Sequence, residues 1–158
     1  MHLLPSFLLT PFKAALTAMF LWVSLALPHL AFAEQLATFG PYQVHYNAFN
    51  SRFIPPEVAQ ANGLIRSKNI GYINVSVLKT SDDASPVAIT AKVSGTAKDL
   101  AGRTQTLTFK TIDEGEAIYY LGQFGFTNNT QLRFTLLVQP DANQPADVIT
   151  FEQTFFLD

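Results

Sequence analysis

The sequence contains no cysteine and little histidine, methionine or tryptophan, with 3 His, 2 Met and 1 Trp among 158 residues. Most of these lie near the amino terminus, so that after residue 33 His45 is the single histidine and no Met or Trp follows. This composition excludes disulfides, a catalytic thiol, cysteine-ligated zinc, iron–sulfur clusters and polyhistidine metal sites. The sequence therefore predicts no metal ion and no cofactor.

Positive charge is also scarce, with 10 Lys and Arg against 12 Asp and Glu. Lys13 is the one charged residue before residue 34, which leaves 9 basic against 12 acidic residues and a net charge of −3. A protein that binds nucleic acid needs a basic surface that displaces counterions from phosphates. Nucleic acid is therefore not an expected partner.

The amino terminus is typical of a cleavable signal peptide. An apolar stretch covers residues 14–27, and Ala31 and Ala33 place small residues at the −3 and −1 positions of a signal-peptidase site. The alternative is a retained anchor, but the stretch is shorter than the about 20 residues that a membrane span needs. We predict a signal peptide over residues 1–33, a periplasmic or secreted destination, and one domain over residues 34–158 with no membrane span.

From Phe39 onward, apolar residues alternate with polar ones at a period of two, as in strands with one buried face. Turn signals rich in Gly, Asn, Asp and Pro separate these runs. The pattern predicts an all-β fold, an immunoglobulin-like antiparallel β-sandwich of seven to eight strands. The alternating runs are Tyr42–Tyr46, Ile73–Val77, Val87–Val93, Leu107–Phe109, Leu132–Val138 and Ile149–Leu157.

Two segments depart from this alternation. Ala117–Phe126 is apolar on both faces, which predicts a central strand or one covered by a loop. Pro55–Gly63 has proline in its first turn and Asn62-Gly63 at its end, which predicts one short helix with a left-handed C-cap.

Seven stretches of the predicted domain, taken together, are similar to a known family: Phe39–Phe49, Phe53–Ala59, Arg66–Asn69, Val93–Ala97, Gly115–Gly122, Arg133–Leu136 and Phe151–Phe156. Together they resemble a family of small, uncharacterised proteobacterial periplasmic proteins that is catalogued as a domain of unknown function. The resemblance implies a bacterial periplasmic location and a β-sandwich. It implies no activity, substrate or catalytic residue.

His45 is the one candidate general base. It shares its parity with Asn47 on the polar face of the first strand. A general base needs a group that orients it, and Asp113, Glu114 and Glu116 are the carboxylates considered for that role. No Gly-x-Ser-x-Gly elbow is present. The sequence favours a histidine that hydrogen-bonds across strands over a catalytic one.

Arg66 and Lys68 form a short basic segment after the predicted helix, and Arg52 lies upstream. Such cations can hold a carboxylate or a phosphate. The alternative is a solvated basic loop, which is the more common role of such segments.

The acidic turn at residues 113–116 offers three carboxylates around a glycine and lacks the pattern of a dedicated calcium loop. We interpret it as a solvated hairpin turn.

Tyr119 and Tyr120 are adjacent in a predicted strand and must point to opposite faces. A tyrosine exposed beside Tyr46 or Tyr72 would suit a recognition surface. The alternative is that these tyrosines close the rim of the core.

The sequence favours a non-catalytic periplasmic protein that binds a protein or cell-envelope component. Two alternatives stay open: a hydrolase that uses His45 with a nearby carboxylate, and a chaperone-like or structural module that acts by β-strand addition. No catalytic residue and no metal ligand is assigned. The candidate ligand or partner surface consists of His45, Tyr46, Asn47, Arg52, Arg66, Lys68, Tyr119 and Tyr120.

Overall fold

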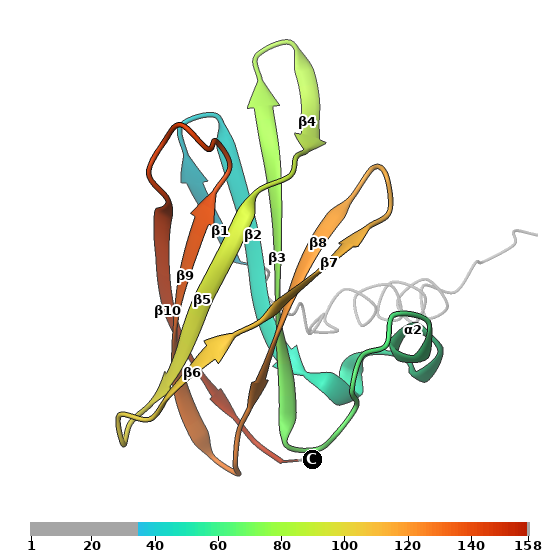
Figure 1. Cartoon of the computed structure of the whole chain (residues 1–158), viewed down its shortest axis with the longest axis vertical. Coiled ribbons are helices and arrows are strands. Elements are labelled where there is room, and N and C mark those ends of the chain that lie inside the picture. The colour runs from blue at the N-terminus through green and yellow to red at the C-terminus, as the bar shows by residue number, and fades with distance from the viewer. Residues whose placement is uncertain (1–34, 158) are drawn as a thin grey trace, which may run out of the picture. The chain divides into compact units, whose positions relative to one another are not determined.

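The computed structural model describes residues 35–157, which form two antiparallel sheets (Figure 1). Sheet A has the order β1-β2-β3-β8-β7, and β4 also pairs with β3. Its strands are β1 (Gln35–Phe39), β2 (Tyr42–Asn50), β3 (Ile70–Ser81), β4 (Ala84–Ala88), β7 (Phe109–Asp113) and β8 (Ile118–Gly125). Sheet B has the order β10-β9-β5-β6. Its strands are β5 (Lys92–Asp99), β6 (Thr104–Leu107), β9 (Thr130–Gln139) and β10 (Asp147–Phe155).

The predicted all-β sandwich is confirmed, but the described residues form ten strands rather than seven to eight. Two runs that were expected to be single strands change sheet halfway. Val87–Val93 divides into β4 in sheet A and β5 in sheet B, and Leu107–Phe109 divides between β6 and β7 at Thr108. The expected inward parity of Val87 is consequently wrong, because its side chain is 62% exposed on β4.

The segments that depart from alternation are confirmed. The run from Ala117 forms β8, which lies between β3 and β7 in sheet A. The predicted helix is α2 (Pro56–Ala61), which follows the 3-10 turn η1 (Ser51–Phe53). Gly63 after the helix has a φ of 60°, a left-handed conformation that glycine adopts without steric penalty. No helix within residues 35–157 is long and apolar enough to cross a membrane. The predicted signal peptide lies outside the described residues.

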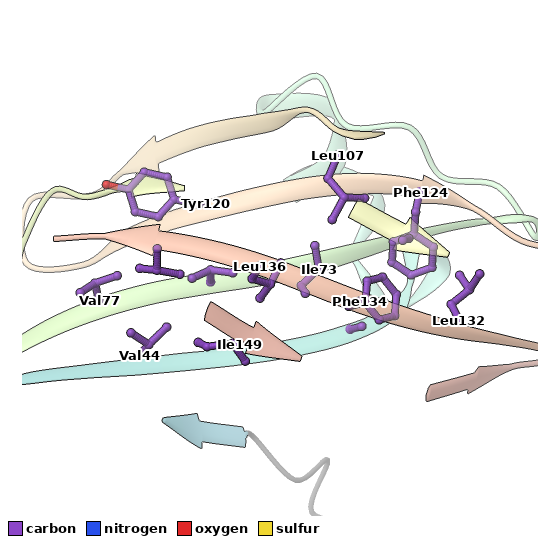
Figure 2. Packing of buried hydrophobic residues seen from close by; sticks show 14 of the residues in the cluster. Val44, Ile73, Val77, Leu107, Tyr120, Phe124, Leu132, Phe134, Leu136 and Ile149 are labelled. Atoms are coloured by element: carbon purple, nitrogen blue, oxygen red, sulfur yellow. The ribbon is translucent and has the colours of Figure 1, made fainter. Parts of the chain in front are cut away.

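The main core lies between the facing sides of the two sheets (Figure 2). Val44 and Ile73 of sheet A and Phe134 and Leu136 of sheet B are fully buried there. The ring of Phe124 meets the ring of Phe134 edge-on, with centroids 5.0 Å apart, in the geometry that aromatic quadrupoles favour. Burial of these side chains from both sheets holds the sandwich together.

A second, smaller core lies on the outer face of sheet A, beneath α2. Its buried members are Ile54, Ala59, Tyr72 and Leu121. Tyr72 and Leu121 have the outward parity of β3 and β8, so the η1–α2 segment covers a face that would otherwise be solvated. The candidate site lies where the edge of the η1–α2 segment meets the outer face of sheet A.

Candidate binding cleft

A cleft of about 320 Å³ opens between the η1–α2 segment and the outer face of sheet A. The walls from the segment and the loop after it are mostly apolar, with Asn62 as the polar member: Phe53, Ile54, Pro55, Val58, Asn62 and Leu64. The sheet contributes Phe49, Ile112 and Leu121 to the floor. Phe53 and Val58 are 57% and 43% exposed, so apolar surface continues outward from the cleft to its rim.

The η1–α2 segment is fixed on the sheet by two polar contacts. The buried Ser51 hydroxyl donates to the carbonyl oxygen of Ser67 and accepts from the Ser67 amide, both at 2.8 Å. The Tyr72 hydroxyl accepts from the Ile65 amide at 2.9 Å and donates to Oε1 of Gln123 at 3.1 Å. The first pair of bonds ties η1 to the loop after α2, and the second pair ties that loop to β3 and β8.

Two hydrogen-bond acceptors face this apolar surround. Asn74 lies on β3, opposite Asn47 of β2 and Leu121 of β8 in the ladder, and its side chain lines the cleft. Its Oδ1 atom is buried and has no hydrogen-bond partner among the described residues. Glu114 lies at the end of β7 and also lines the cleft, and no side chain within residues 35–157 forms an ion pair with its carboxylate. Glu114 is exposed, so water can satisfy its carboxylate, whereas a buried acceptor such as Oδ1 of Asn74 is normally satisfied by a donor.

A neighbouring hollow of about 390 Å³ shares Leu64 and Leu121 with the cleft. Lys110 lines this second hollow, where its Nζ donates to the carbonyl oxygen of Asn62. The ammonium therefore belongs to one hollow and the Glu114 carboxylate to the other. Glu114 is the charged side chain among the described residues that line the cleft.

The candidate residues of β2 divide between the two faces of sheet A. His45 and Asn47 have the outward parity, and His45 lies between Leu36 of β1 and Ser76 of β3 in the ladder. Tyr46 has the inward parity, and its ring packs against Phe151 with centroids 5.0 Å apart. Burial there raises the pKa of the Tyr46 hydroxyl. Tyr46 is therefore a partly buried residue at the margin of the core, and its assignment to a partner surface stays a prediction.

Tyr119 and Tyr120 point to opposite faces, as predicted. Tyr119 is half-buried and lines the cleft. Tyr120 is buried in the main core, where its hydroxyl accepts from the Ala91 amide at 2.8 Å. Tyr120 is thus removed from the candidate surface, because the inward parity of β8 places it between the sheets.

The basic candidates are brought together in part, beside η1 rather than in the cleft. Nη2 of Arg66 donates to the carbonyl oxygen of Arg52 at 3.2 Å. Lys68 follows in the same loop and is exposed. Within residues 35–157, no three His, Cys, Asp or Glu side chains gather where they could hold a metal ion.

Several cleft residues were not assigned to a site from the sequence: Phe53, Val58, Asn74 and Ile112. In the sequence, Asn74 belongs to the polar side of an alternating strand, and Glu114 belongs to an acidic turn and is one of the carboxylates considered beside His45. The one available signal was the predicted helix, because a short helix outside a sandwich must cover part of a sheet face.

Replacing Ser51 with alanine is expected to lower the free energy of unfolding by about 1 kcal/mol, because the Ser67 amide and carbonyl lose their buried partner. Urea denaturation measures the loss, and hydrogen exchange of the Ser67 amide should become faster. Ser94→Ala, at an exposed position of β5, is the control and should change neither quantity. An unchanged exchange rate at Ser67 in the Ser51 variant would show that this bond does not fix the loop.

Comparison with known proteins identifies relatives of this chain. A family model described as a domain of unknown function (DUF4426) matches residues 36–158. The crystal structure of a DUF4426 family protein from Pseudomonas aeruginosa has a TM-score of 0.67 and 42% identity, and the match covers 79% of this chain and 96% of that one. No curated protein matches the chain.

Two structures of FetP from uropathogenic Escherichia coli share the fold alone. One is FetP as isolated after recombinant expression in the E. coli periplasm, with a TM-score of 0.56 and 12% identity. The other is a copper-bound FetP variant, with a TM-score of 0.55 and 13% identity. Each match covers 79% of this chain and 95% or 96% of the FetP chain.

Proposed function

The chain belongs to the DUF4426 family, and from this premise we propose that it is a periplasmic, non-catalytic β-sandwich that binds a protein or cell-envelope component through the cleft under α2. The observation that carries this proposal is the cleft itself, about 320 Å³ in volume and apolar in its walls. Ligand sites are typically concave and mostly apolar, with a few polar groups that fix orientation.

The rim of the cleft supports a macromolecular occupant. Phe53 and Val58 both belong to the η1–α2 segment and line the cleft, and both leave much of their apolar surface in solvent. Exposed apolar surface that continues out of a pocket is a common mark of an interaction site. The half-buried Tyr119 adds a ring with a polar end, which is a frequent contributor to binding energy.

The periplasmic location is supported by the predicted signal peptide and agrees with the compartment in which FetP was expressed. Copper is bound by the FetP variant. After residue 33 the sequence offers one histidine and no Cys or Met, which are the usual copper ligands. The described residues do not bring His45 into a group of metal-binding side chains.

A hydrolase is not favoured by the arrangement around His45. A histidine base needs a carboxylate or another group that orients its ring, and the neighbours of His45 in the ladder are Leu36 and Ser76. The carboxylates once considered for that role lie at the β7–β8 turn, and Glu114 faces the cleft from there.

Strand addition is favoured by one observation, the length of β10. This strand covers nine residues and has β9 as its single ladder partner among the described strands. However, the Gln153 side chain donates to the carbonyl oxygen of Ala48, and Asn50 donates to that of Phe156. These contacts fasten the carboxyl half of β10 to β2, so the edge that a partner strand could use is the half that contains Val148.

In-cell photo-crosslinking distinguishes these functions. A photo-crosslinking amino acid replaces Val58 at the cleft rim or, as the matched control, the exposed Val148 on β10. We expect a discrete adduct from position 58 and none from position 148 when the full-length protein is made in the cells that produce it naturally. An adduct from position 148 alone would favour strand addition. No adduct from position 58 would overturn the proposed function.

A further inference from the structure

We propose that Asn62-Gly63, where α2 ends, is a deamidation site that the fold holds closed and that reacts only when this end of the helix opens. This inference goes beyond the proposed binding function. Asparagine followed by glycine is the pair most prone to deamidation, because glycine has no side chain that hinders its own amide nitrogen. The sequence contains a single Asn-Gly pair.

The reaction needs only water besides the two residues. The amide nitrogen of Gly63 loses its proton and attacks Cγ of Asn62, so that a new C–N bond closes a succinimide ring. The side-chain nitrogen takes up a proton and leaves as ammonia. Water then opens the ring at one of its two carbonyl carbons. Opening at Cγ gives aspartate, and opening at the backbone carbon gives isoaspartate, in which the chain runs through the side-chain carbon. No group is oxidised or reduced.

The end of α2 engages the attacking amide. The Gly63 amide donates to the carbonyl oxygen of Gln60 at 3.2 Å, and the Leu64 amide donates to that of Ala59 at 2.8 Å. These two bonds are the pair that defines a Schellman motif, and Gly63 has the left-handed φ of 60° that the motif requires. An amide nitrogen that is held in this motif is not free to attack.

Asn62 is also held away from the reactive geometry. Its Nδ2 donates to the carbonyl oxygen of Val58 at 3.0 Å, and its own carbonyl oxygen accepts from Nζ of Lys110 on β7. Its ψ of 4° turns the Gly63 nitrogen away from the Asn62 side chain. Ring closure therefore needs a rotation about the Cα–C bond, which carries the carbonyl oxygen away from Lys110 and the Gly63 amide away from its acceptor.

The position of this pair favours local opening. The helix has six residues, of which only Ala59 is buried. Gly63 and Lys110 are exposed, and Asn62 is half-buried. Helices this short depend on packing for their stability, and segments with few buried contacts open at a lower free energy than the core does. We therefore expect the end of α2 to open while both sheets stay folded.

Deamidation would change one wall of the cleft. Asn62 lines the cleft together with Glu114, so a carboxylate at position 62 adds a second negative charge to its lining. The product also lacks the Nδ2 donor and turns a carboxylate oxygen toward the carbonyl of Val58. The end of the helix would then close less favourably, so a reversible opening becomes a lasting change of this wall.

The test compares the folded exported protein with the free peptide 53–66. Trypsin releases this peptide by cleavage after Arg52 and Arg66, and it carries the same Asn-Gly pair without the fold. Both are incubated at neutral pH, and mass spectrometry of the 53–66 fragment measures conversion to aspartate and isoaspartate. We expect the folded protein to react at least about tenfold more slowly than the peptide, because each event needs a local opening. Hydrogen exchange of the Leu64 amide measures that opening independently.

Two lysine variants test the closed geometry without altering the 53–66 fragment. Lys110→Ala removes the donor to the Asn62 carbonyl and should raise both deamidation and exchange at Leu64 by about threefold or more. Lys68→Ala is the matched control, because Lys68 is exposed and lines neither the cleft nor the neighbouring hollow, and it should change neither rate. Equal rates in folded protein and peptide would overturn the proposal. So would conversion of the peptide with none in the folded Lys110 variant, or equal rates in the two lysine variants.

Discussion

We expect replacement of Phe134 with alanine to lower the free energy of unfolding by about 3–5 kcal/mol, the range for large-to-small changes in a packed core. Phe134 on β9 is fully buried. Its ring lies 5.0 Å from that of Phe124, 4.9 Å from that of Phe151 and 6.1 Å from that of Phe155, measured between centroids. These rings come from β8 in sheet A and β10 in sheet B, so alanine would leave a cavity that neither sheet can close alone.

Urea denaturation of the exported protein, followed by circular dichroism at the β-sheet band, measures this loss. The matched control is Phe156→Ala, since Phe156 follows β10 and its side chain is 55% exposed. It should change the free energy of unfolding by less than about 1 kcal/mol. Similar losses for the two variants would contradict the position of Phe134 at the centre of the sandwich.

The buried side of each strand could be predicted because a strand alternates its side chains with a period of two. The parity of Leu132, Phe134 and Leu136 predicted one inward face, and all three are buried. The opposite directions of Tyr119 and Tyr120 followed from the same rule. The helix at Pro56–Ala61 was predicted from its terminal residues, which have local conformational preferences that do not depend on the rest of the fold.

The assignment of strands to sheets could not be predicted from this periodicity. Both sheets bury one face in the same core. The alternation of a run therefore does not indicate at which residue the chain crosses from one sheet to the other. Thr108 separates β6 in sheet B from β7 in sheet A, and residues 89–91 separate β4 in sheet A from β5 in sheet B. The crossings depend on which neighbours a strand pairs with, and those neighbours are distant in sequence.

The cleft could not be predicted from the sequence for the same reason. Its lining combines α2 with residues of β2, β3, β7 and β8, which no local pattern brings together. The burial of Oδ1 of Asn74 without a partner likewise depends on the tertiary structure around β3, which the alternation of that strand does not reveal. Of the residues first assigned to a partner surface, Tyr119 lines the cleft and Asn47 lies opposite Asn74 in the ladder.

Replacing Gly95 with alanine is expected to lower the free energy of unfolding by about 2–3 kcal/mol, because it overfills a tightly packed position. Gly95 lies in β5, opposite Leu136 of β9 and Leu107 of β6. A methyl group there would lie 2.7 Å from the carbonyl oxygen of Thr135 and 3.0 Å from Cδ2 of Leu136. The carbonyl belongs to the backbone of β9, which is held between β5 and β10, so it cannot move aside as the end of a flexible side chain could.

Gly125→Ala is the matched control, because Gly125 also lies in a strand and also has no positive φ. The atoms nearest to its added methyl group would be Oε1 of Gln105 at 3.7 Å and the carbonyl oxygen of Asn69 at 3.9 Å. Both distances are ordinary van der Waals contacts. We expect it to change the free energy of unfolding by less than about 1 kcal/mol. If Gly95→Ala were as stable as the unmodified protein, β5 and β9 would have to separate easily. The ladder of eight residue pairs from Lys92–Gln139 to Asp99–Leu132 makes such a separation unfavourable, because it would disturb pairing along both strands.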